Sequence, residues 1–332
     1  MTAELVAISA AIEAGESVRG TTSPNPPVGC AIVSASGALI ATGATSPAGG
    51  PHAEVNALEQ AGERARGATA VVTLEPCNHT GRTGPCSQAL VEAGIARVVY
   101  FTADPNDAAA GGAEYLRSHG VEVDFQPVRI AALQPWLRSV RHNRPSVTLK
   151  FASTLDGFTA AADGTSQWIT GDTARELVHE DRAKIDVIIV GTGTAIADDP
   201  SLTARFPDGT LRQHQPRRVV IGSREVPEGN LSRLGFEQYA MPLEALDALW
   251  NTGARDVLVE GGAALAASFL ELDLVDAVQA YIAPALLGAG RGVLDRAIAG
   301  TIADAYRFRT TAVRQVGNDV FIEMERDVYG TY

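Results

Sequence analysis

Four side chains that could carry chemistry stand in two short segments of the first third of the chain. The segment PHAEV places His52 and Glu54 two residues apart at the start of an expected helix. The segment EPCNHTGRTGPC places Cys77 on a loop and Cys86 at the start of the next expected helix. One imidazole and two thiolates make a three-ligand zinc site with an open fourth position, as catalytic zinc requires. The spacing therefore favours a metal centre built for catalysis.

Glu54 is the carboxylate that could move protons at such a centre. Zinc lowers the pKa of bound water to about 7, so hydroxide becomes available at neutral pH. We expect Glu54, two residues from a ligand, to carry a proton from this water to a leaving amine. His-x-Glu followed by Pro-Cys-x-x-Cys is the signature of zinc deaminases. Here eight residues separate the cysteines, and Gly81, Gly84 and Pro85 supply the turns for a compact excursion.

Other interpretations of the cysteines remain open at this point. A disulfide is disfavoured, because three cysteines are an odd count that suits a reducing compartment. Taken alone, Cys77 and Cys86 could be buried structural thiols. A closed structural zinc site needs a fourth ligand, for which His79 is the only nearby candidate. Cys30, within an expected strand, is predicted to be an inert core thiol.

Composition limits the class of protein. A length of 332 residues suits two domains, and 45% hydrophobic with 20% charged residues describes a packed globular chain. A net charge of −12 argues against nonspecific binding of nucleic acid or of an anionic membrane. The first twenty residues lack the basic cluster of a signal peptide, and the apolar runs are too short to span a bilayer. We therefore expect a cytoplasmic protein.

Hydrophobic patterning in the first half alternates between strands and helices. Helices are expected at 2–15, 53–65, 86–94 and 112–119, and strands at 29–34, 38–43, 69–74, 97–102 and 121–125. The tripeptide ASG between the first two strands indicates a hairpin. The order predicts a sheet that helices cover on both faces.

The segment from Phe125 to Leu155 contains no Asp or Glu but carries five cations: Arg129, Arg138, Arg141, Arg144 and Lys150. The simpler interpretation is a linker helix whose long basic side chains face solvent. The alternative is that some of these cations face a phosphate. We place the domain boundary at about 143–146, where HNRPS breaks the pattern.

The second half predicts another α/β domain with a mixed sheet. Strands are expected at 146–151, 186–191, 217–222, 255–260, 277–283 and 319–326, with a helix at 261–272. The run VGTGTAI does not complete the dinucleotide pattern Gly-x-Gly-x-x-Gly, because its last position is Ile196. In VEGGAALAASF, backbone amides around Gly262 could hold a pyrophosphate, or the glycines could simply make a tight turn.

Taken together, these motifs resemble a known family, the bifunctional deaminase-reductases of riboflavin biosynthesis. The resemblance covers nearly the whole chain and rests on TSPNPPVGCAIV, GGPHAEVNAL, GATAVVTLEPCNHTGRTGPC, DPN, LKFASTLDG, SQWITG, ADDPSLTAR and VEGG. It implies a cytidine-deaminase-like three-layer α/β/α domain over 1–144. It also implies a dihydrofolate-reductase-like α/β domain over 145–332.

The resemblance implies that the first domain deaminates 2,5-diamino-6-ribosylamino-4(3H)-pyrimidinone 5′-phosphate. One zinc ion per chain would be held by His52, Cys77 and Cys86, with Glu54 as the proton carrier. The substrate pocket would be lined by Asn25, His79, Arg82, Asp104 and Asn106. Without the family, the segment DPN at 104–106 would be interpreted as a plain turn.

The same resemblance implies that the second domain reduces the ribosyl group of the deaminated product, 5-amino-6-(5-phosphoribosylamino)uracil, to ribityl with NADPH. The cofactor would be contacted by Ala152, Trp168, Thr194, Asp198, Ser223 and Gly262. The substrate would be contacted by Lys150, Ser166, Arg182, Leu202, Arg205 and Glu260, with Arg182 and Arg205 as phosphate clamps. The partners implied are phosphorylated pyrimidines and further copies of the chain, as a dimer or tetramer.

The chain departs from the family pattern in two places. Gly84 stands where a proline is usual before Pro-Cys, and the segment Ser223 to Glu260 is shorter than the family normally carries. A strand and a loop near the adenosine end of the cofactor are therefore expected to be missing. This leaves two alternative hypotheses, an active deaminase with a degenerate reductase half and a noncatalytic zinc-stabilised interaction protein.

Overall fold

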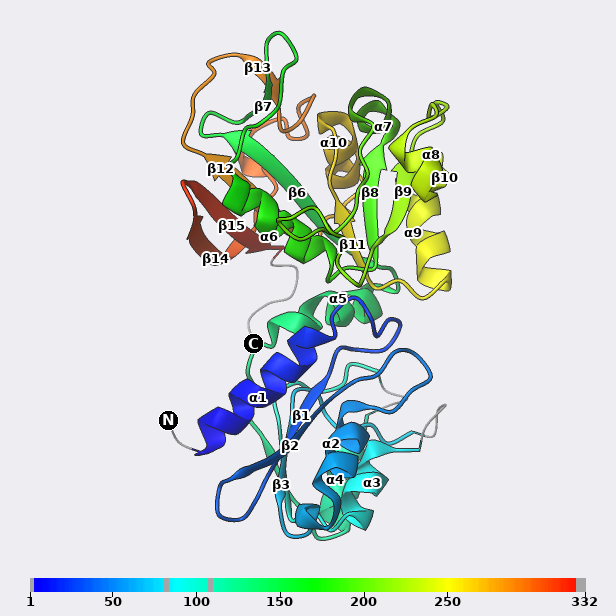
Figure 1. The fold of residues 1–332 in the computed structure, drawn as a ribbon, viewed down its shortest axis with the longest axis vertical. Helices are drawn as coiled ribbons and strands as arrows, with labels where there is room; N and C mark the ends of the chain where they lie inside the picture. The colour runs from blue at the N-terminus through cyan, green and yellow to red at the C-terminus, as the bar shows by residue number, and fades with distance from the viewer. Residues whose placement is uncertain (1–2, 80–83, 107–109, 327–332) are drawn as a thin grey trace. The chain divides into compact units, whose positions relative to one another are not determined.

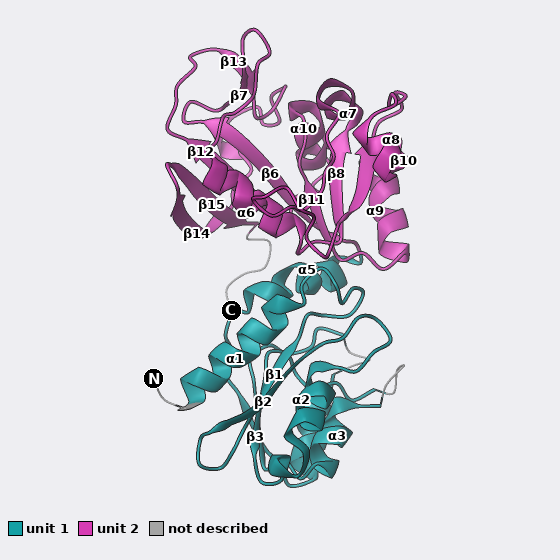
Figure 2. Cartoon of the chain, in the orientation of Figure 1, with its two compact units in different colours: residues 1–143 teal, residues 144–332 magenta. Residues whose placement is uncertain are grey.

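The computed structural model describes residues 3–79, 84–106 and 110–326. Contacts between residues divide the chain into two compact units, Met1–Asn143 and Arg144–Tyr332, which Figure 2 shows in different colours. The division falls one residue before the predicted boundary between 144 and 145. Each unit has its own sheet, and each is described separately below.

Unit 1 is built on a sheet of five described strands in the order β2-β1-β3-β4-β5. The predicted hairpin forms β1 and β2, which pair antiparallel, whereas β3, β4 and β5 run parallel. The bounds are β1 Gly29–Val33, β2 Leu39–Ala44, β3 Thr69–Val72, β4 Arg97–Tyr100 and β5 Glu122–Phe125. Every strand predicted from this half of the sequence is present.

Helices cover both faces of this sheet, as Figure 1 shows. They are α1 Ala3–Ser17, α2 Ala53–Ala61, α3 Cys86–Glu92, α4 Gly112–Ser118 and α5 Gln134–His142. Two glycines allow the first two helices to approach the strands. A Cβ on Gly29 would meet the Ala11 carbonyl of α1, and one on Gly43 would meet the Ala53 carbonyl of α2. Because Gly43 pairs with the residue after Gly29, the two contacts lie on opposite faces of the sheet, giving three layers.

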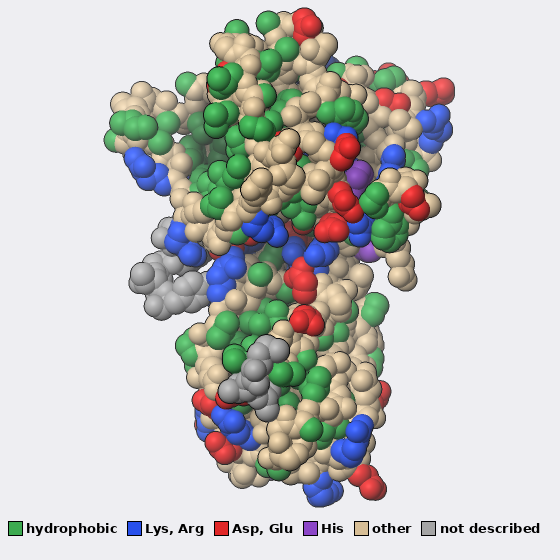
Figure 3. All heavy atoms as spheres, turned by 60° about the vertical axis from the view of Figure 1, so that its left-hand side comes forward, with side chains coloured by type: hydrophobic (Ala, Val, Ile, Leu, Met, Phe, Trp, Pro, Cys, Tyr) green, Lys and Arg blue, Asp and Glu red, His purple; other side chains and the backbone are tan. Residues whose placement is uncertain are grey.

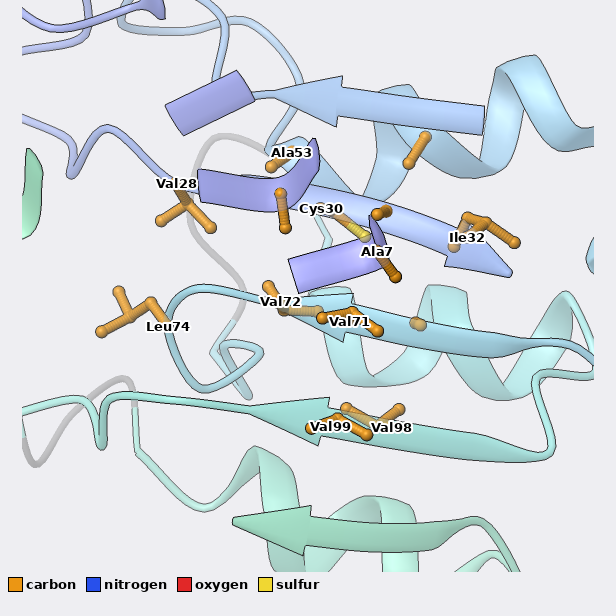
Figure 4. Close-up of a cluster of buried hydrophobic side chains, with 14 of the residues drawn as sticks. Ala7, Val28, Cys30, Ile32, Ala53, Val71, Val72, Leu74, Val98 and Val99 are labelled. Atoms are coloured by element: carbon orange, nitrogen blue, oxygen red, sulfur yellow. The ribbon is translucent and has the colours of Figure 1, made fainter. Parts of the chain in front are cut away.

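The core of unit 1 consists of small aliphatic side chains from these layers. Cys30 is fully buried in it, and Figure 4 shows this thiol in the cluster that includes Ala7, Val71 and Val72. Burial raises the pKa of the Cys30 thiol well above its usual value, and the nearby Glu54 carboxylate adds to the effect. Cys30 is thus a core thiol, as predicted.

Unit 2 contains a sheet of eight described strands in the order β10-β9-β8-β11-β6-β12-β15-β14. The first six run parallel, and β15 and β14 add antiparallel at one edge, so the sheet is mixed as predicted. The bounds are β6 Ser146–Thr154, β8 Val187–Gly191, β9 Arg217–Ile221, β10 Glu237–Tyr239, β11 Asp256–Val259, β12 Ala277–Ala283, β14 Arg309–Val316 and β15 Asp319–Glu325. A separate two-stranded sheet pairs β7 Phe158–Ala161 with β13 Gly290–Gly292.

The helices of unit 2 are α6 Asp172–Arg182, α7 Thr192–Asp198, α8 Asn230–Leu234, α9 Pro242–Asn251 and α10 Ala263–Glu271. The segment Ser223 to Glu260, expected to lack a strand, contains α8, β10, α9 and β11. Its edge strand, β10, has only three residues. The parallel sheet therefore continues past β9, although by a short strand.

Arg144, one of the five cations in the acid-free segment 125–155, binds a carboxylate of the protein. Its guanidinium donates to both carboxylate oxygens of Asp276, at 2.7 and 2.9 Å, and the carboxylate also accepts the Val147 backbone N–H. Arg144 therefore holds the start of β6 in place.

Among the described helices, none is long and apolar enough to cross a membrane. On the face in Figure 3, acidic and basic side chains are interspersed.

Candidate active sites

Three potential metal ligands meet in unit 1. His52 immediately precedes α2, Cys77 lies in the loop after β3, and Cys86 is the first residue of α3. The His52 Nδ1 atom is 3.6 Å from Cys77 Sγ and 3.3 Å from Cys86 Sγ. All three ligand atoms lie within 4.8 Å of one another.

This donor set fits zinc. Tetrahedral coordination with Zn–S of about 2.3 Å and Zn–N of about 2.0 Å places nitrogen and sulfur about 3.5 Å apart. The two observed nitrogen–sulfur separations, 3.3 and 3.6 Å, bracket that value. Within the described part of the chain, no fourth His, Cys, Asp or Glu joins the group, so one coordination position would remain for water or substrate.

Electrostatics favour the thiolate form that a metal requires. The Cys86 side chain and the His52 ring hold the pKa of the Cys77 thiol far below its usual range, at about 4. The Cys86 backbone N–H also donates to Cys77 Sγ at 3.4 Å. In return, the hydrogen bond to Cys77 and burial raise the pKa of Cys86, and the hydrogen bond to Cys77 raises the pKa of His52. One thiol of the pair therefore ionises readily.

Glu54 lies beside these ligands in the first turn of α2. It is only 4% exposed, and its carboxylate hydrogen-bonds the Cys86 side chain. Burial is the main cause that raises the pKa of Glu54 to about 7, and the charge of Cys77 adds to it. A buried carboxylate at this place can both accept and release a proton.

The described structure brings together only some of the residues that were predicted to contact the first substrate. Asp104 is half-buried, and burial raises its pKa, while the hydrogen bond from the Asn106 backbone N–H and the charge of His79 lower it. The Asn106 backbone N–H donates to Asp104 Oδ1 at 2.9 Å, closing the turn expected for DPN. Asn25 is half-buried in the loop before β1, and Arg82 lies outside the described residues.

A second polar cluster lies in unit 2, where Lys150 of β6, Arg182 of α6 and Glu260 after β11 converge. The Arg182 guanidinium donates to both Glu260 oxygens, at 2.8 and 2.7 Å, and Lys150 Nζ is 3.7 Å from Glu260 Oε2. The family resemblance predicts all three as substrate contacts, and the fold brings them together from three separate elements.

Burial and the mutual attraction of the charges have opposite effects on the pKa values in this cluster. Burial tends to raise the pKa of Glu260, but the charges of Arg182 and Lys150 outweigh it and lower the pKa to about 2. Burial lowers the pKa of Lys150, and Glu260 partly restores it. The cluster thus holds an ionised carboxylate between two cations.

Thr203, which the sequence did not single out, links further residues to the cluster. Its carbonyl accepts from Arg182 Nη1 at 3.1 Å, and its hydroxyl accepts from Arg205 Nε at 2.7 Å. Leu202, the residue before it, is buried. Because the guanidinium of Arg182 already binds Glu260, Arg205 is the better candidate for binding a phosphate. Only the motif ADDPSLTAR, which contains Thr203, could have drawn attention to it.

Only two of the six residues predicted to bind the cofactor line the same cavity. Thr194 and Gly262 line one cavity of about 430 Å³. The remaining four, and the predicted substrate contact Ser166, do not line this cavity: Ala152, Trp168, Asp198 and Ser223. Trp168, whose residue type alone would suggest a core position, is 68% exposed, with the Arg175 guanidinium 4.2 Å from its ring centroid.

Tyr281 is a second residue that the sequence did not indicate as part of the cluster. It is 1% exposed on β12, its hydroxyl donates to Asp181 Oδ2 at 3.2 Å, and its ring centroid lies 5.6 Å from Lys150 Nζ. In the sequence it is only one apolar position in a late strand. No pattern in a single sequence indicates that this strand lies beside β6.

Family models match both units. Residues 1–102 match the model described as the zinc-binding region of cytidine and deoxycytidylate deaminases. Residues 145–322 match the model described as the RibD C-terminal domain. Both are models of enzyme domains, so neither a noncatalytic interaction protein nor a degenerate reductase half is favoured.

Individual proteins match over nearly the whole chain. The riboflavin biosynthesis protein RibD of Corynebacterium ammoniagenes is 60% identical over 90% of this chain and 91% of its own. A solved structure of Acinetobacter baumannii RibD is 38% identical, with a TM-score of 0.81, covering 97% of this chain and 98% of that one. A structure of a Thermotoga maritima diaminohydroxyphosphoribosylaminopyrimidine deaminase/5-amino-6-(5-phosphoribosylamino)uracil reductase is 32% identical with a TM-score of 0.84, covering 98% and 99%.

Proposed function

Because the chain belongs to the RibD family of bifunctional riboflavin biosynthesis proteins, we propose how its own residues divide the two reactions. The chain is a zinc-dependent deaminase and an NADPH-dependent reductase. Unit 1 would deaminate 2,5-diamino-6-ribosylamino-4(3H)-pyrimidinone 5′-phosphate. Unit 2 would then reduce the ribosyl group of 5-amino-6-(5-phosphoribosylamino)uracil to ribityl. These substrates agree with the two activities for which the Thermotoga maritima relative is named.

The observation that carries the deaminase assignment is the convergence of His52, Cys77 and Cys86 within 4.8 Å beside the buried Glu54. Zinc held by the three ligands supplies a Lewis acid that makes water nucleophilic near neutral pH. Glu54 would accept a proton from the attacking water and would donate a proton to the amine that leaves the pyrimidine ring. A purely structural site would have no use for a buried carboxylate beside an open coordination position.

For the pyrimidine, we propose that polar side chains around the metal centre hold the ring and its phosphate. Asn25, His79, Asp104 and Asn106 would read the ring edge by hydrogen bonds, and Arg82 would meet the phosphate. The charge of Cys77 contributes to raising the pKa of Asp104, which supports a place for Asp104 near the metal ligands.

In the reductase unit, NADPH supplies the hydride, and the protein must orient the sugar and the nicotinamide. We assign Lys150 to the oxygen or imine nitrogen of the sugar, because its ammonium is the cation of the cluster that remains outside the bidentate pair. Glu260 would hold both cations in place, and Arg205, which donates to the Thr203 hydroxyl, would take the phosphate. Ser166 would complete the substrate contacts.

Assembly and location are part of the same proposal. The protein would be a homo-oligomer, a dimer or tetramer, and the absence of a disulfide among its three cysteines would suit the cytoplasm. Size-exclusion chromatography with light scattering would measure the mass of the assembly directly.

The deaminase assignment is tested by Glu54→Gln. We expect zinc content to remain at one ion per chain while the deaminase kcat falls by roughly 10²- to 10⁴-fold, because the proton carrier is lost. The matched control is Glu59→Gln, an exposed glutamate on the same helix, which should retain full activity. Metal analysis and a coupled ammonia assay measure both quantities. Full deaminase activity in Glu54→Gln would show that the assignment is wrong.

A further inference from the structure

The loop between α1 and β1 carries Asn25, which the proposed function places against the pyrimidine ring. Val28, near the end of this loop, exchanges two hydrogen bonds with Thr45, the residue after β2. The backbone N–H of Gly29 donates to the hydroxyl of Thr73, the residue after β3, at 3.0 Å. Along the chain, β2 and β3 each lead to one of the proposed metal ligands. The loop therefore ends between the two segments that carry those ligands.

Hydrogen bonds inside the loop close a turn around Asn25. Its backbone N–H donates to the Thr22 carbonyl at 3.0 Å, and the hydroxyl of Thr22, which is buried, donates to the Asn25 carbonyl at 3.0 Å. The Pro24 carbonyl, which belongs to the peptide directly before Asn25, is bound from outside the loop. One end of this peptide thus depends on another element of unit 1.

Trp136 of α5 binds the Pro24 carbonyl. Its indole N–H donates to this oxygen at 3.0 Å. Trp136 is only 8% exposed and belongs to the same hydrophobic core as Leu133 and Leu137, so its ring is held in one place. The contact therefore fixes the orientation of the peptide between Pro24 and Asn25, and with it the direction in which the Asn25 side chain leaves the backbone.

The simpler account of this contact is that it only satisfies a buried indole N–H. The position of the acceptor favours a role in the site, because the bound carbonyl directly precedes a proposed substrate contact. Among the described residues, none hydrogen-bonds the Asn25 side chain, so its amide is available to a ligand. The direction of that amide then depends on the backbone that Trp136 holds.

We propose that Trp136 is a positioning residue of the deaminase site, which directs Asn25 toward the pyrimidine through the Pro24 carbonyl. The inference rests on the proposed contact between Asn25 and the ring. The match to the zinc-binding region of cytidine and deoxycytidylate deaminases covers residues 1–102 and ends before α5. This helix would thus contribute to recognition of the pyrimidine from outside the matched region, without a part in metal binding.

Trp136→Phe in the full chain tests the inference, because it keeps an aromatic ring and removes the N–H. We expect the KM for the pyrimidine 5′-phosphate to rise about 3- to 10-fold, as for one lost neutral hydrogen bond. The deaminase kcat should stay within about twofold of wild type, and zinc at one ion per chain. Trp136→His, which keeps a ring N–H, should recover part of the affinity.

Leu137→Ala is the matched control for stability. It truncates a buried core residue of the same helix and should lower Tm while leaving the KM within about twofold of wild type. Calorimetric binding of the same pyrimidine 5′-phosphate to Glu54→Gln, with and without Trp136→Phe, measures the affinity without turnover and should show the same loss.

A double-mutant cycle with Asn25→Ala tests whether Trp136 acts through Asn25. In the Asn25→Ala background, Trp136→Phe should cause no further rise in KM. If Asn25→Ala raises the KM, an unchanged KM in Trp136→Phe or additive increases in the double mutant would overturn the inference and leave the proposed function intact. An unchanged KM in Asn25→Ala would refute the proposed substrate contact, and the inference with it.

Discussion

Glu260 is the residue on which the charge balance of the reductase site depends. Its carboxylate accepts two hydrogen bonds from Arg182 and faces Lys150, and all three groups are largely buried. A buried ion pair gives little net stability, yet removal of one partner leaves an uncompensated charge. Glu260 therefore couples the stability of unit 2 to the protonation of a single site.

The acid response of unit 2 should reveal this coupling. The folded-state pKa of Glu260, about 2, is below its unfolded value of about 4.5, so the stabilisation is complete above pH about 4.5 and is lost as pH falls toward 2. Glu260→Gln should flatten the decline of the unfolding free energy in that window. Urea titrations at several pH values measure the slope.

The control for this experiment is Glu176→Gln, an exposed glutamate on α6. It should keep the wild-type slope. An unchanged slope in Glu260→Gln would mean that other carboxylates dominate acid unfolding of this unit.

At the scale of elements, the position of α2 depends on Gly43, because this residue of β2 has no side chain to keep the helix away from the sheet. A Cβ on Gly43 would meet the backbone of Ala53 and Ala57, so α2 can pack at this distance only on glycine. His52 and Glu54 stand at the start of the same helix. A shift of α2 would therefore move the proposed metal ligand His52 and the proposed proton carrier Glu54 together.

Gly43→Ala should accordingly lower both stability and deaminase activity. Overpacking of this kind costs about 1–3 kcal/mol, which for a unit of this size lowers Tm by roughly 2–4 °C per kcal/mol. Gly84→Ala adds the same methyl group where nothing lies within 4 Å, and it should leave Tm unchanged. Differential scanning calorimetry of both variants provides the comparison, and equal Tm values would contradict the packing argument.

The sequence predicted the elements of unit 1 far better than those of unit 2. Apart from the hairpin of the first two, the predicted strands of unit 1 alternate with helices. In unit 2 the sequence did not indicate α7, whose seven residues TGTAIAD are small and polar, or β13, a three-residue strand that exists only by pairing with β7. Such elements are fixed by tertiary contacts that local pattern does not carry.

The sites divide in the same way. The proposed metal ligands could be found from sequence because zinc restricts the residue types, and two of the three, His52 and Cys86, lie at helix starts. Thr203 and Tyr281 could not, since their roles depend on a carbonyl direction and on a strand neighbour.

At the scale of the whole molecule, the two chemistries are carried by separate units. The three proposed metal ligands all lie within 1–143, and Lys150, Arg182 and Glu260 all lie within 144–332. Removal of zinc should therefore abolish deamination while the reductase retains its activity on supplied deaminated product. Dialysis against a chelator, followed by both assays, measures the two activities. Readdition of zinc is the control, and a parallel loss of both activities would contradict the separation.

The spread of the metal ligands along the chain has a consequence for folding. In the unfolded chain, His52 and Cys86 are separated by a long flexible segment, and closing that loop costs entropy before any coordination bond forms. The ligands come together only when the starts of α2 and α3 are both docked at the same edge of the sheet. Part of the free energy of zinc binding is then free energy of folding, so the bound ion would stabilise the arrangement in which both helices are docked. The zinc ion proposed for catalysis in unit 1 would therefore also stabilise the folded state of this unit.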